Sequence, residues 1–182
     1  MGRVVLYIAT SIDGYIAGEQ GEMNWLEQFP NPEKEDYGYV HFLSGVEAVV
    51  MGRKTYEHIL SLGVDWPYPE QKTYVASRNG FFKVNTPHTE VVTSEVGHFL
   101  RGLQEKAIQD IWLVGGGELN AYCLEEGVID QMILTLIPIL LGKGRPLFLR
   151  TPQGTPQASS WHLDQVISYQ NGVVQLMYHV AT

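Results

Sequence analysis

The segment Ile111–Leu124, IWLVGGGELNAYCL, constrains the fold more than any other part of the chain. Four apolar residues precede Gly115-Gly116-Gly117, and the residues after the glycines have the spacing of an amphipathic helix. This pattern predicts a buried strand that ends in a tight turn and passes directly into a helix. Glycine lets backbone N–H groups approach a ligand closely, and the amino end of a helix favours negative charge. The turn is therefore a candidate phosphate site, although tight strand–helix packing explains the glycines about equally well.

The same order of strand, glycine and helix occurs earlier in the chain. An apolar run, Ala48-Val49-Val50-Met51, breaks at Gly52, and a helical pattern covers residues 53–60. A third apolar run, residues 73–76, ends at a serine and an arginine. Cations and hydroxyl groups therefore follow strands that this kind of fold places side by side, where an anion would bind. The candidate anion-binding residues are Gly52, Arg53, Lys54, Thr55, Ser77 and Arg78.

Strand and helix patterns alternate along the rest of the chain. The other expected strands are residues 4–9, 90–93, 132–136, 147–149, 161–169 and 173–180, and the other expected helices are residues 31–44 and 96–107. Gln170-Asn171-Gly172 joins the last two strands and predicts a hairpin. We predict an α/β fold in a single domain, residues 1–182, with a mixed, mostly parallel sheet, helices on both faces and a C-terminal antiparallel hairpin.

Charge and cysteine content argue against several classes of partner. The chain has 20 acidic and 12 basic residues and a net charge of −8, which argues against nucleic acid or an anionic membrane as the main partner. Its one cysteine, Cys123, excludes an internal disulfide, and we expect a small core residue there rather than a nucleophile. The apolar run at residues 4–9 is too short for a signal peptide, so we expect a soluble, cytoplasmic protein.

Several catalytic motifs are missing from the sequence. The six histidines share no metal-ligand spacing and join no acidic cluster, so we expect no metal. No Gly-x-Ser-x-Gly segment indicates a serine hydrolase. The segment Gly115–Asn120 lacks the third glycine of a Rossmann fingerprint and lies late in the chain.

A long loop and one carboxylate are further candidates for function. Ser11–Trp25 is glycine-rich and polar, and a long loop in a compact domain is often functional, so we interpret it as a lid. Asp36 falls on the apolar stripe of the helix expected over residues 31–44. It either interacts with the helix dipole or faces a pocket, and the residues alone favour neither.

Two segments carry a more specific signal. Met51-Gly52-Arg53-Lys54-Thr55-Tyr56-Glu57 and Val114-Gly115-Gly116-Gly117-Glu118-Leu119 resemble the Gly-Arg-x-Thr-aromatic-Glu segment and the paired-glycine loop of the dihydrofolate reductase-like fold. Residues 9–17, ATSIDGYIA, and 138–144, PILLGKG, are closer to the reductase domain of the bifunctional riboflavin-biosynthesis (RibD-type) deaminase/reductase and its stand-alone relatives. The resemblance covers about residues 3–148 and implies NADPH as the cofactor.

This resemblance implies roles for the residues that match. Arg53 and Thr55 would contact the adenosine phosphates, Ser77 and Arg78 the 2′-phosphate, and the glycine loop the pyrophosphate. A cis peptide bond is expected within the three glycines. The implied cofactor-binding residues are Ala9, Ile16, Gly52, Arg53, Lys54, Thr55, Ser77, Arg78, Val114, Gly115, Gly116, Gly117, Glu118 and Leu119.

The resemblance also implies three catalytic residues. Asp36 lies sixteen residues before Gly52, the interval at which dihydrofolate reductases place the carboxylate that binds the substrate ring. Thr135 matches its hydroxyl partner and Trp25 the tryptophan of the lid. The basic residues that would bind a ribose phosphate or a folate tail are not evident, so the substrate is left open.

These features lead to one main hypothesis and its alternatives. We expect an NADPH-dependent reductase of a small planar heterocycle, pterin- or pyrimidine-like. The alternatives are a non-catalytic nucleotide- or metabolite-binding domain on the same scaffold, and a structural module that binds no nucleotide. Apolar residues on both faces of the last hairpin also predict a homodimer, with core packing an equal alternative.

Overall fold

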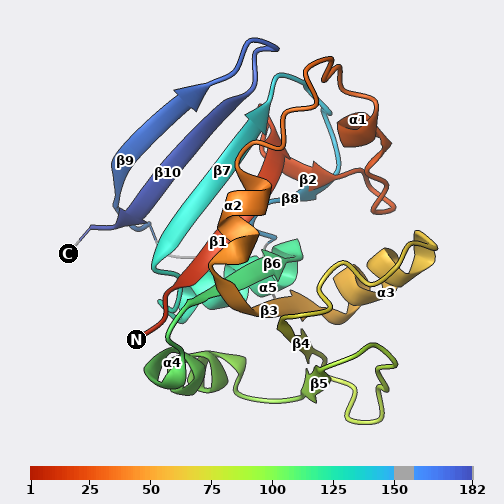
Figure 1. Ribbon diagram of the computed structural model, residues 1–182, viewed down its shortest axis with the longest axis vertical. Coiled ribbons are helices and arrows are strands. Elements are labelled where there is room, and N and C mark those ends of the chain that lie inside the picture. The colour runs from red at the N-terminus through yellow and green to blue at the C-terminus, as the bar shows by residue number, and fades with distance from the viewer. Residues whose placement is uncertain (150–157, 182) are drawn as a thin grey trace.

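The computed structural model describes residues 1–149 and 158–181. Its main sheet contains β1 (Val4–Ser11), β3 (Val46–Gly52), β4 (Lys72–Ala76), β5 (Thr89–Val92), β6 (Asp110–Gly115), β7 (Gln131–Ile137), β9 (Trp161–Ser168) and β10 (Val174–Val180). The strand order is β5-β4-β3-β6-β1-β7-β10-β9 (Figure 1). The first six of these strands are parallel, whereas β10 is antiparallel to both β7 and β9. The predicted mixed, mostly parallel sheet with a C-terminal antiparallel hairpin is confirmed.

Helices cover both faces of this sheet. Two apolar clusters lie on its opposite sides, because consecutive strand residues such as Val49 and Val50 point to opposite faces. The helices α2 (Tyr39–Ser44) and α3 (Arg53–Ser61) pack on the Val49 side, and α4 (Val96–Lys106) and α5 (Gly117–Glu125) pack on the Val50 side. Cys123 lies fully buried in α5, where burial raises the pKa of its thiol to about 12, as expected for a core residue.

The parallel strands bring their carboxyl ends together. Met51 of β3 lies opposite Gly115 of β6, and Gly52 lies opposite Ala76 of β4. On the other side of β6, Ala9 of β1 lies opposite Thr135 of β7. The glycine turns and the predicted catalytic threonine therefore lie on the same side of the sheet, toward the carboxyl ends of its parallel strands.

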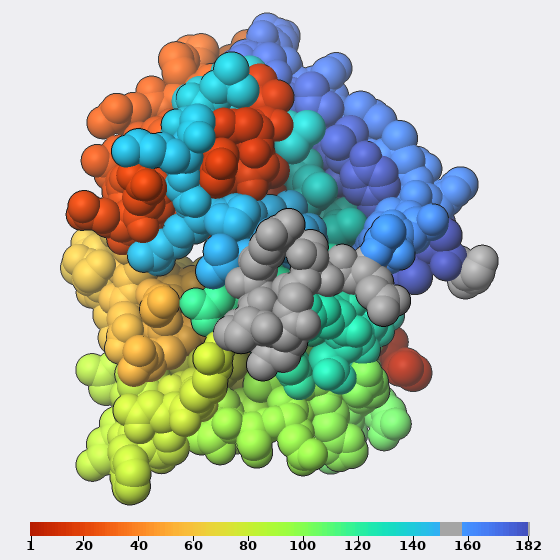
Figure 2. Space-filling view, turned by 180° about the vertical axis from the view of Figure 1, so that it is seen from behind, coloured from red at the N-terminus to blue at the C-terminus, as the bar shows by residue number. Residues whose placement is uncertain are grey.

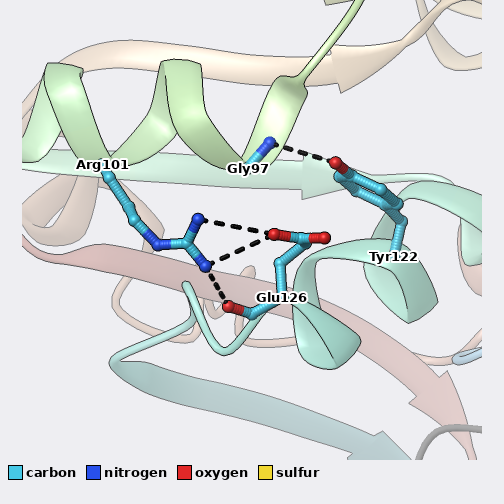
Figure 3. A network of polar contacts seen from close by, with 4 residues as sticks. All are labelled: Gly97, Arg101, Tyr122 and Glu126. Carbon is cyan, nitrogen blue, oxygen red and sulfur yellow. Dashed lines mark hydrogen bonds and ion pairs between the residues drawn. The ribbon is translucent and has the colours of Figure 1, made fainter.

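The helices α4 and α5 are held together by the contacts drawn in Figure 3. The guanidinium of Arg101 in α4 donates to the Glu126 backbone carbonyl at 2.5 Å and to its carboxylate at 3.3 Å. The backbone N–H of Gly97 donates to the Tyr122 hydroxyl at 3.4 Å. Arg101 thus caps the carboxyl end of α5, whose amino end forms the glycine turn.

Two expected elements are wrong. No helix covers residues 31–38: the Asn31 side chain accepts the Glu35 N–H at 2.9 Å, and Tyr37 has a φ of 54°, which a right-handed helix does not allow. Helix α2 therefore begins only at Tyr39. The strand expected over 147–149 is also absent, and β8 instead comprises Arg145–Pro146, paired with β2 (Tyr15–Ala17).

The longest described helix, α4, has 11 residues, whereas a membrane-crossing helix needs about 20 apolar ones. No helix in residues 1–149 and 158–181 is long and apolar enough to span a bilayer.

Candidate functional site

The glycine turn after β6 is shaped so that a side chain does not fit. Gly115 and Gly116 both have a φ of 103°, a conformation that residues with a Cβ rarely adopt. A Cβ on Gly115 would lie 2.6 Å from Asn120 Oδ1, and one on Gly116 would lie 3.1 Å from Thr55 Oγ1. The predicted tight turn between a buried strand and a helix is therefore confirmed. The expected cis peptide is wrong, because every peptide bond in the described residues is trans.

A second helix begins beside this turn. Gly52 precedes α3 and lies next to β6, where a Cβ on it would make an ordinary van der Waals contact of 3.6 Å with the Gly115 carbonyl oxygen. Thr55 in the first turn of α3 donates its hydroxyl to the same carbonyl at 3.2 Å. Both α3 and α5 have nine residues, and neither has a side-chain cap. Two sets of amino-terminal N–H groups and two helix dipoles therefore meet at one edge of the sheet.

Charged side chains surround the glycine turn. Glu118 of α5 lies 3.5 Å from Lys54 Nζ and 3.2 Å from Arg78 Nη2. Arg78 is 86% exposed, so these contacts are readily exchanged for others. Arg53 lies along its own helix, 3.9 Å from Glu57, and Ser77 accepts the Asn79 N–H at 3.1 Å. The structure thus brings Lys54 and Arg78 together as expected, with a carboxylate between them.

A cavity of about 280 Å³ lies over β1 and β7, on the face covered by α2. Aromatic and apolar side chains dominate its wall, as in many small-molecule sites. Asp36 and Thr135, two of the three predicted catalytic residues, both line it. The lining residues are Tyr7, Ala9, Leu26, Phe29, Asn31, Asp36, Tyr37, Tyr39, Thr135 and Ile137.

Asp36 has both of the roles considered for it from sequence. Its carboxylate caps α2, accepting the N–H groups of Val40 at 3.0 Å and Gly38 at 2.9 Å, and the same side chain lines the cavity. The two N–H donors hold the pKa of Asp36 below its ordinary value. The cavity therefore has an exposed anion at its edge.

Thr135 does not bond to Asp36, contrary to expectation. Its hydroxyl instead contacts Gln175 Nε2 at 3.0 Å, and the same amide nitrogen donates to the Tyr37 carbonyl at 3.0 Å. Tyr7 donates its hydroxyl to that carbonyl at 2.9 Å. Sequence reasoning missed Gln175, although a glutamine inside the apolar run of β10 could have indicated a buried polar contact.

Comparison with known proteins assigns the chain to a family. The family described as the RibD C-terminal domain matches residues 3–175. The chain belongs to the RibD C-terminal domain family. The uncharacterized protein YwjB of Bacillus subtilis (strain 168) is 37% identical over 146 residues, which cover 80% of this chain and 82% of YwjB.

Solved structures resemble this RibD-family chain over its full length. A putative riboflavin biosynthesis protein from Shewanella sp. PV-4 has 32% identity and a TM-score of 0.86, with 100% of both chains covered. Dihydrofolate reductase from Enterococcus faecalis, complexed with NADP(H) and RAB-propyl, has 16% identity and a TM-score of 0.69, with 100% of this chain and 98% of that chain covered. The latter likeness concerns the fold alone. The suspected kinship with RibD-type reductase domains and the dihydrofolate reductase-like fold are both confirmed.

In this RibD-family chain the expected lid is bonded to the segment around β8. Asp13 accepts the N–H groups of Leu141 at 3.2 Å and Gly142 at 2.7 Å, and these donors together with the Ser11 hydroxyl lower its pKa. The Leu147 N–H donates to the Gly14 carbonyl at 2.9 Å. Hydrogen bonds therefore attach the first half of Ser11–Trp25 to residues 141–147.

The same loop runs into α1 (Asn24–Glu27), which includes its last two residues. Leu26 and Phe29 line the cavity, whereas Trp25 does not, and Trp25 Nε1 is buried without a partner in the described residues. Ala9 also lines the cavity rather than the glycine turn. Trp25 thus belongs to a helix whose next residue, Leu26, lines the cavity.

The other predicted cofactor residues occupy the surroundings of the glycine turn. Val114 and Leu119 pack in the apolar clusters on opposite faces of the sheet, and Ile16 lies in β2. The Gly117 carbonyl accepts the Leu149 N–H at 3.0 Å, so the chain after β8 borders the start of α5. Figure 2 shows a hollow between α3, in orange-yellow, and the cyan-blue segment that contains β8. In the described residues, no group of three or more His, Cys, Asp or Glu could hold a metal ion.

Proposed function

We propose that the protein is an NADPH-dependent reductase of a small planar heterocycle, pterin- or pyrimidine-like. The observation that carries this proposal is the aromatic cavity with a carboxylate and a hydroxyl group at the ends of β1 and β7. The glycine turn of β6 lies on the strand next to β1, and strands in a sheet are about 4.8 Å apart. A ring in the cavity and a dinucleotide at the turn would therefore be neighbours.

The residues at the turn fit a dinucleotide. Backbone N–H groups in the first turn of α5 have no partner within the helix and suit the pyrophosphate, with Gly115–Leu119 around it. Arg53 and Thr55 at the start of α3 would bind the adenosine phosphates. Ser77 and Arg78 would bind the 2′-phosphate, with Lys54 nearby, once Arg78 and Lys54 leave Glu118.

The bound cofactor would supply a hydride, and the residues of the cavity would prepare the ring. The aromatic walls suit a flat ring, with Tyr7 supported by Phe42 at a centroid distance of 4.6 Å. Asp36 would accept a ring N–H and favour the protonated, electron-poor form of the substrate. Thr135 would bond the same ring edge, and Trp25 and α1 would form the cover that excludes water.

We also propose that the protein is cytoplasmic and that it forms a homodimer through β9. The strand β9 is an edge of the sheet and carries the exposed side chains of Leu163 and Val166. Val180 on β10 adds to the apolar surface of the same hairpin. An exposed edge with apolar side chains favours pairing with a second copy.

The test is a screen of pterins and pyrimidines in which NADPH oxidation is followed by absorbance, beside titrations of NADPH binding. We expect NADPH to bind and to be oxidised only with a ring substrate. Binding of NADPH and ring compounds without oxidation would instead support a non-catalytic binding domain. Absence of NADPH binding would contradict the proposal.

A further inference from the structure

Gln175 is a buried amide placed directly behind the cavity. It lies on β10 opposite Thr135 of β7, and only 2% of its surface is exposed. Figure 1 shows β10 beside β7, on the side away from β1. Gln175 does not line the cavity itself, whereas Thr135 and Tyr37, which its amide contacts, both do.

The orientation of the Gln175 amide follows from its partners. The Tyr37 carbonyl only accepts hydrogen bonds, so the amide group 3.0 Å from it must be the NH2 group. The Tyr7 hydroxyl lies 3.5 Å from the same nitrogen, farther than the Tyr37 carbonyl and the Thr135 hydroxyl at 3.0 Å, and it donates its own hydrogen to the Tyr37 carbonyl. The two hydrogens of Nε2 are therefore directed at the Tyr37 carbonyl and the Thr135 hydroxyl.

This arrangement fixes the direction of the Thr135 hydrogen bond. An amide nitrogen has no free lone pair, so Thr135 accepts from Gln175 and its own hydrogen points elsewhere. Thr135 is 3% exposed, and no other described group contacts its hydroxyl oxygen within hydrogen-bond distance. A buried donor without an acceptor is costly, and the cavity is where an acceptor can enter.

We propose that Gln175 is a positioning residue that makes Thr135 a hydrogen-bond donor to the bound ring and holds the Tyr37 carbonyl beside Asp36. The inference rests on the proposed function, because it needs a ring in the cavity. The ring then offers an acceptor to Thr135 and a donor to Asp36, which accepts hydrogen bonds as a carboxylate. Gln175 thereby selects between rings of the same size that differ in their polar edges.

The test reverses the direction of the Thr135 hydrogen bond. In Gln175→Glu, burial favours the neutral acid. Its O–H group takes the place of Nε2, donates its one hydrogen to the Tyr37 carbonyl and accepts the Thr135 hydrogen on its oxygen. The probes are uracil, which has carbonyl acceptors, and 2,4-diaminopyrimidine, which has amino donors, and their binding is measured by NMR titration. Asp36 acts on both probes in both proteins, so the change of the ratio isolates Thr135. We expect Gln175→Glu to shift the ratio of dissociation constants about tenfold toward 2,4-diaminopyrimidine, relative to the wild type. The matched control is Gln165→Glu on the exposed strand β9, which should leave the ratio unchanged.

Other outcomes separate this inference from the proposed function. An unchanged ratio in folded Gln175→Glu would overturn the role of Gln175 while leaving a ring-binding cavity. If Gln175→Glu does not fold, the variant Thr135→Val is the test. It should weaken the binding of uracil about tenfold and hardly change the binding of 2,4-diaminopyrimidine. If Thr135→Val and the wild type bind uracil with equal affinity, the inference is overturned. If the wild type binds neither probe, the proposed ring site is wrong, and the inference with it.

Discussion

The Asp36 carboxylate and the Thr135 hydroxyl line the same cavity but are bonded to different neighbours. Asp36 accepts two backbone N–H groups at the start of α2, whereas Thr135 contacts the Gln175 amide on β10. Because the two groups form no hydrogen bond with each other, both can contact a ligand. A carboxylate fixed by backbone donors and a hydroxyl fixed by a buried amide form a preorganised polar edge, which favours orientation of a bound ring.

We predict that Asp36→Asn lowers turnover by about 2–4 orders of magnitude and leaves NADPH binding unchanged, because the charge that favours the protonated ring is lost. Asparagine is also a good helix cap, so α2 should persist. Steady-state kinetics with the identified substrate, NADPH titration and a melting curve test this. Glu35→Gln changes an exposed neighbouring carboxylate and should remain active. Full activity of Asp36→Asn would remove the aspartate from the mechanism.

Arg78→Ala should weaken NADPH about tenfold or more and hardly affect NADH, because a guanidinium bonds the 2′-phosphate that NADH lacks. The dissociation constants of both cofactors can be measured by fluorescence titration. Lys106→Ala removes one positive charge at the end of α4, close to where β6 begins and so far from the carboxyl ends of the strands. This control should change neither constant. Equal losses for both cofactors in Arg78→Ala would show that Arg78 does not read the 2′-phosphate.

Gly116→Ala should lower the free energy of unfolding by about 1–2 kcal/mol and weaken NADPH, because alanine at a positive φ is strained. The added methyl group would also lie 3.1 Å from Thr55 Oγ1. The matched control is Gly102→Ala in α4, where a Cβ meets nothing within 4 Å and where alanine should stabilise by about 0.5–1 kcal/mol. Urea denaturation measures both. A Gly116→Ala protein as stable as the wild type would contradict the geometry of the turn.

The stability of the protein should fall in acid through Asp13 and Asp36. Both have pKa values below the ordinary 3.8, because N–H and O–H donors hold the charged forms. A depressed folded-state pKa stabilises the fold above about pH 3.8, and this contribution is lost as pH falls through the folded-state value. The free energy of unfolding of the double variant Asp13→Asn/Asp36→Asn should therefore change less between pH 6 and pH 3 than that of the wild type. If the free energy of unfolding depends on pH in the same way in the double variant and the wild type, neither pKa is depressed.

Val166→Lys should convert the proposed dimer into a monomer, because Val166 is 54% exposed on the edge strand β9 and a lysine there opposes pairing. Ile108→Lys, at an 88% exposed position between α4 and β6, is the control and should remain dimeric. Light scattering after size-exclusion chromatography gives both masses. A wild-type protein that is monomeric at micromolar concentration would exclude the dimer.

Most of the fold could be predicted from the sequence because its signals are local. Apolar runs that end at Gly52 or Gly115, and the helical spacing after each, specify two strand–turn–helix units within a few residues. Asn171-Gly172 likewise predicts the last hairpin, and Gly172 has the positive φ of 87° that such a turn requires. The prediction of a strand over residues 147–149 was wrong, because an apolar run forms a strand only where a neighbouring strand can pair with it.

Local signals failed between residues 31 and 38. Asn31, a proline and an acid imitate the start of a helix, but the Asn31 side chain closes a turn onto Glu35, and the cap of α2 comes from Asp36 five residues later. The helix on whose stripe Asp36 was expected does not extend to residue 36, whereas the interval between Asp36 and Gly52 identified the same residue without that helix. Its place in the cavity depends on Tyr37, whose carbonyl is held by Tyr7 and Gln175.

The sequence by itself therefore determined the elements, the glycine turns and the residue types available at the edge of the sheet. Only the tertiary structure decided which side chains form hydrogen bonds and ion pairs with one another. Gln175 is 40 residues from Thr135 and 138 from Tyr37, and Arg78 is 40 residues from Glu118. No spacing along the chain encodes such contacts, because they arise from the order of the strands and from which side chains share a face after the sheet has formed.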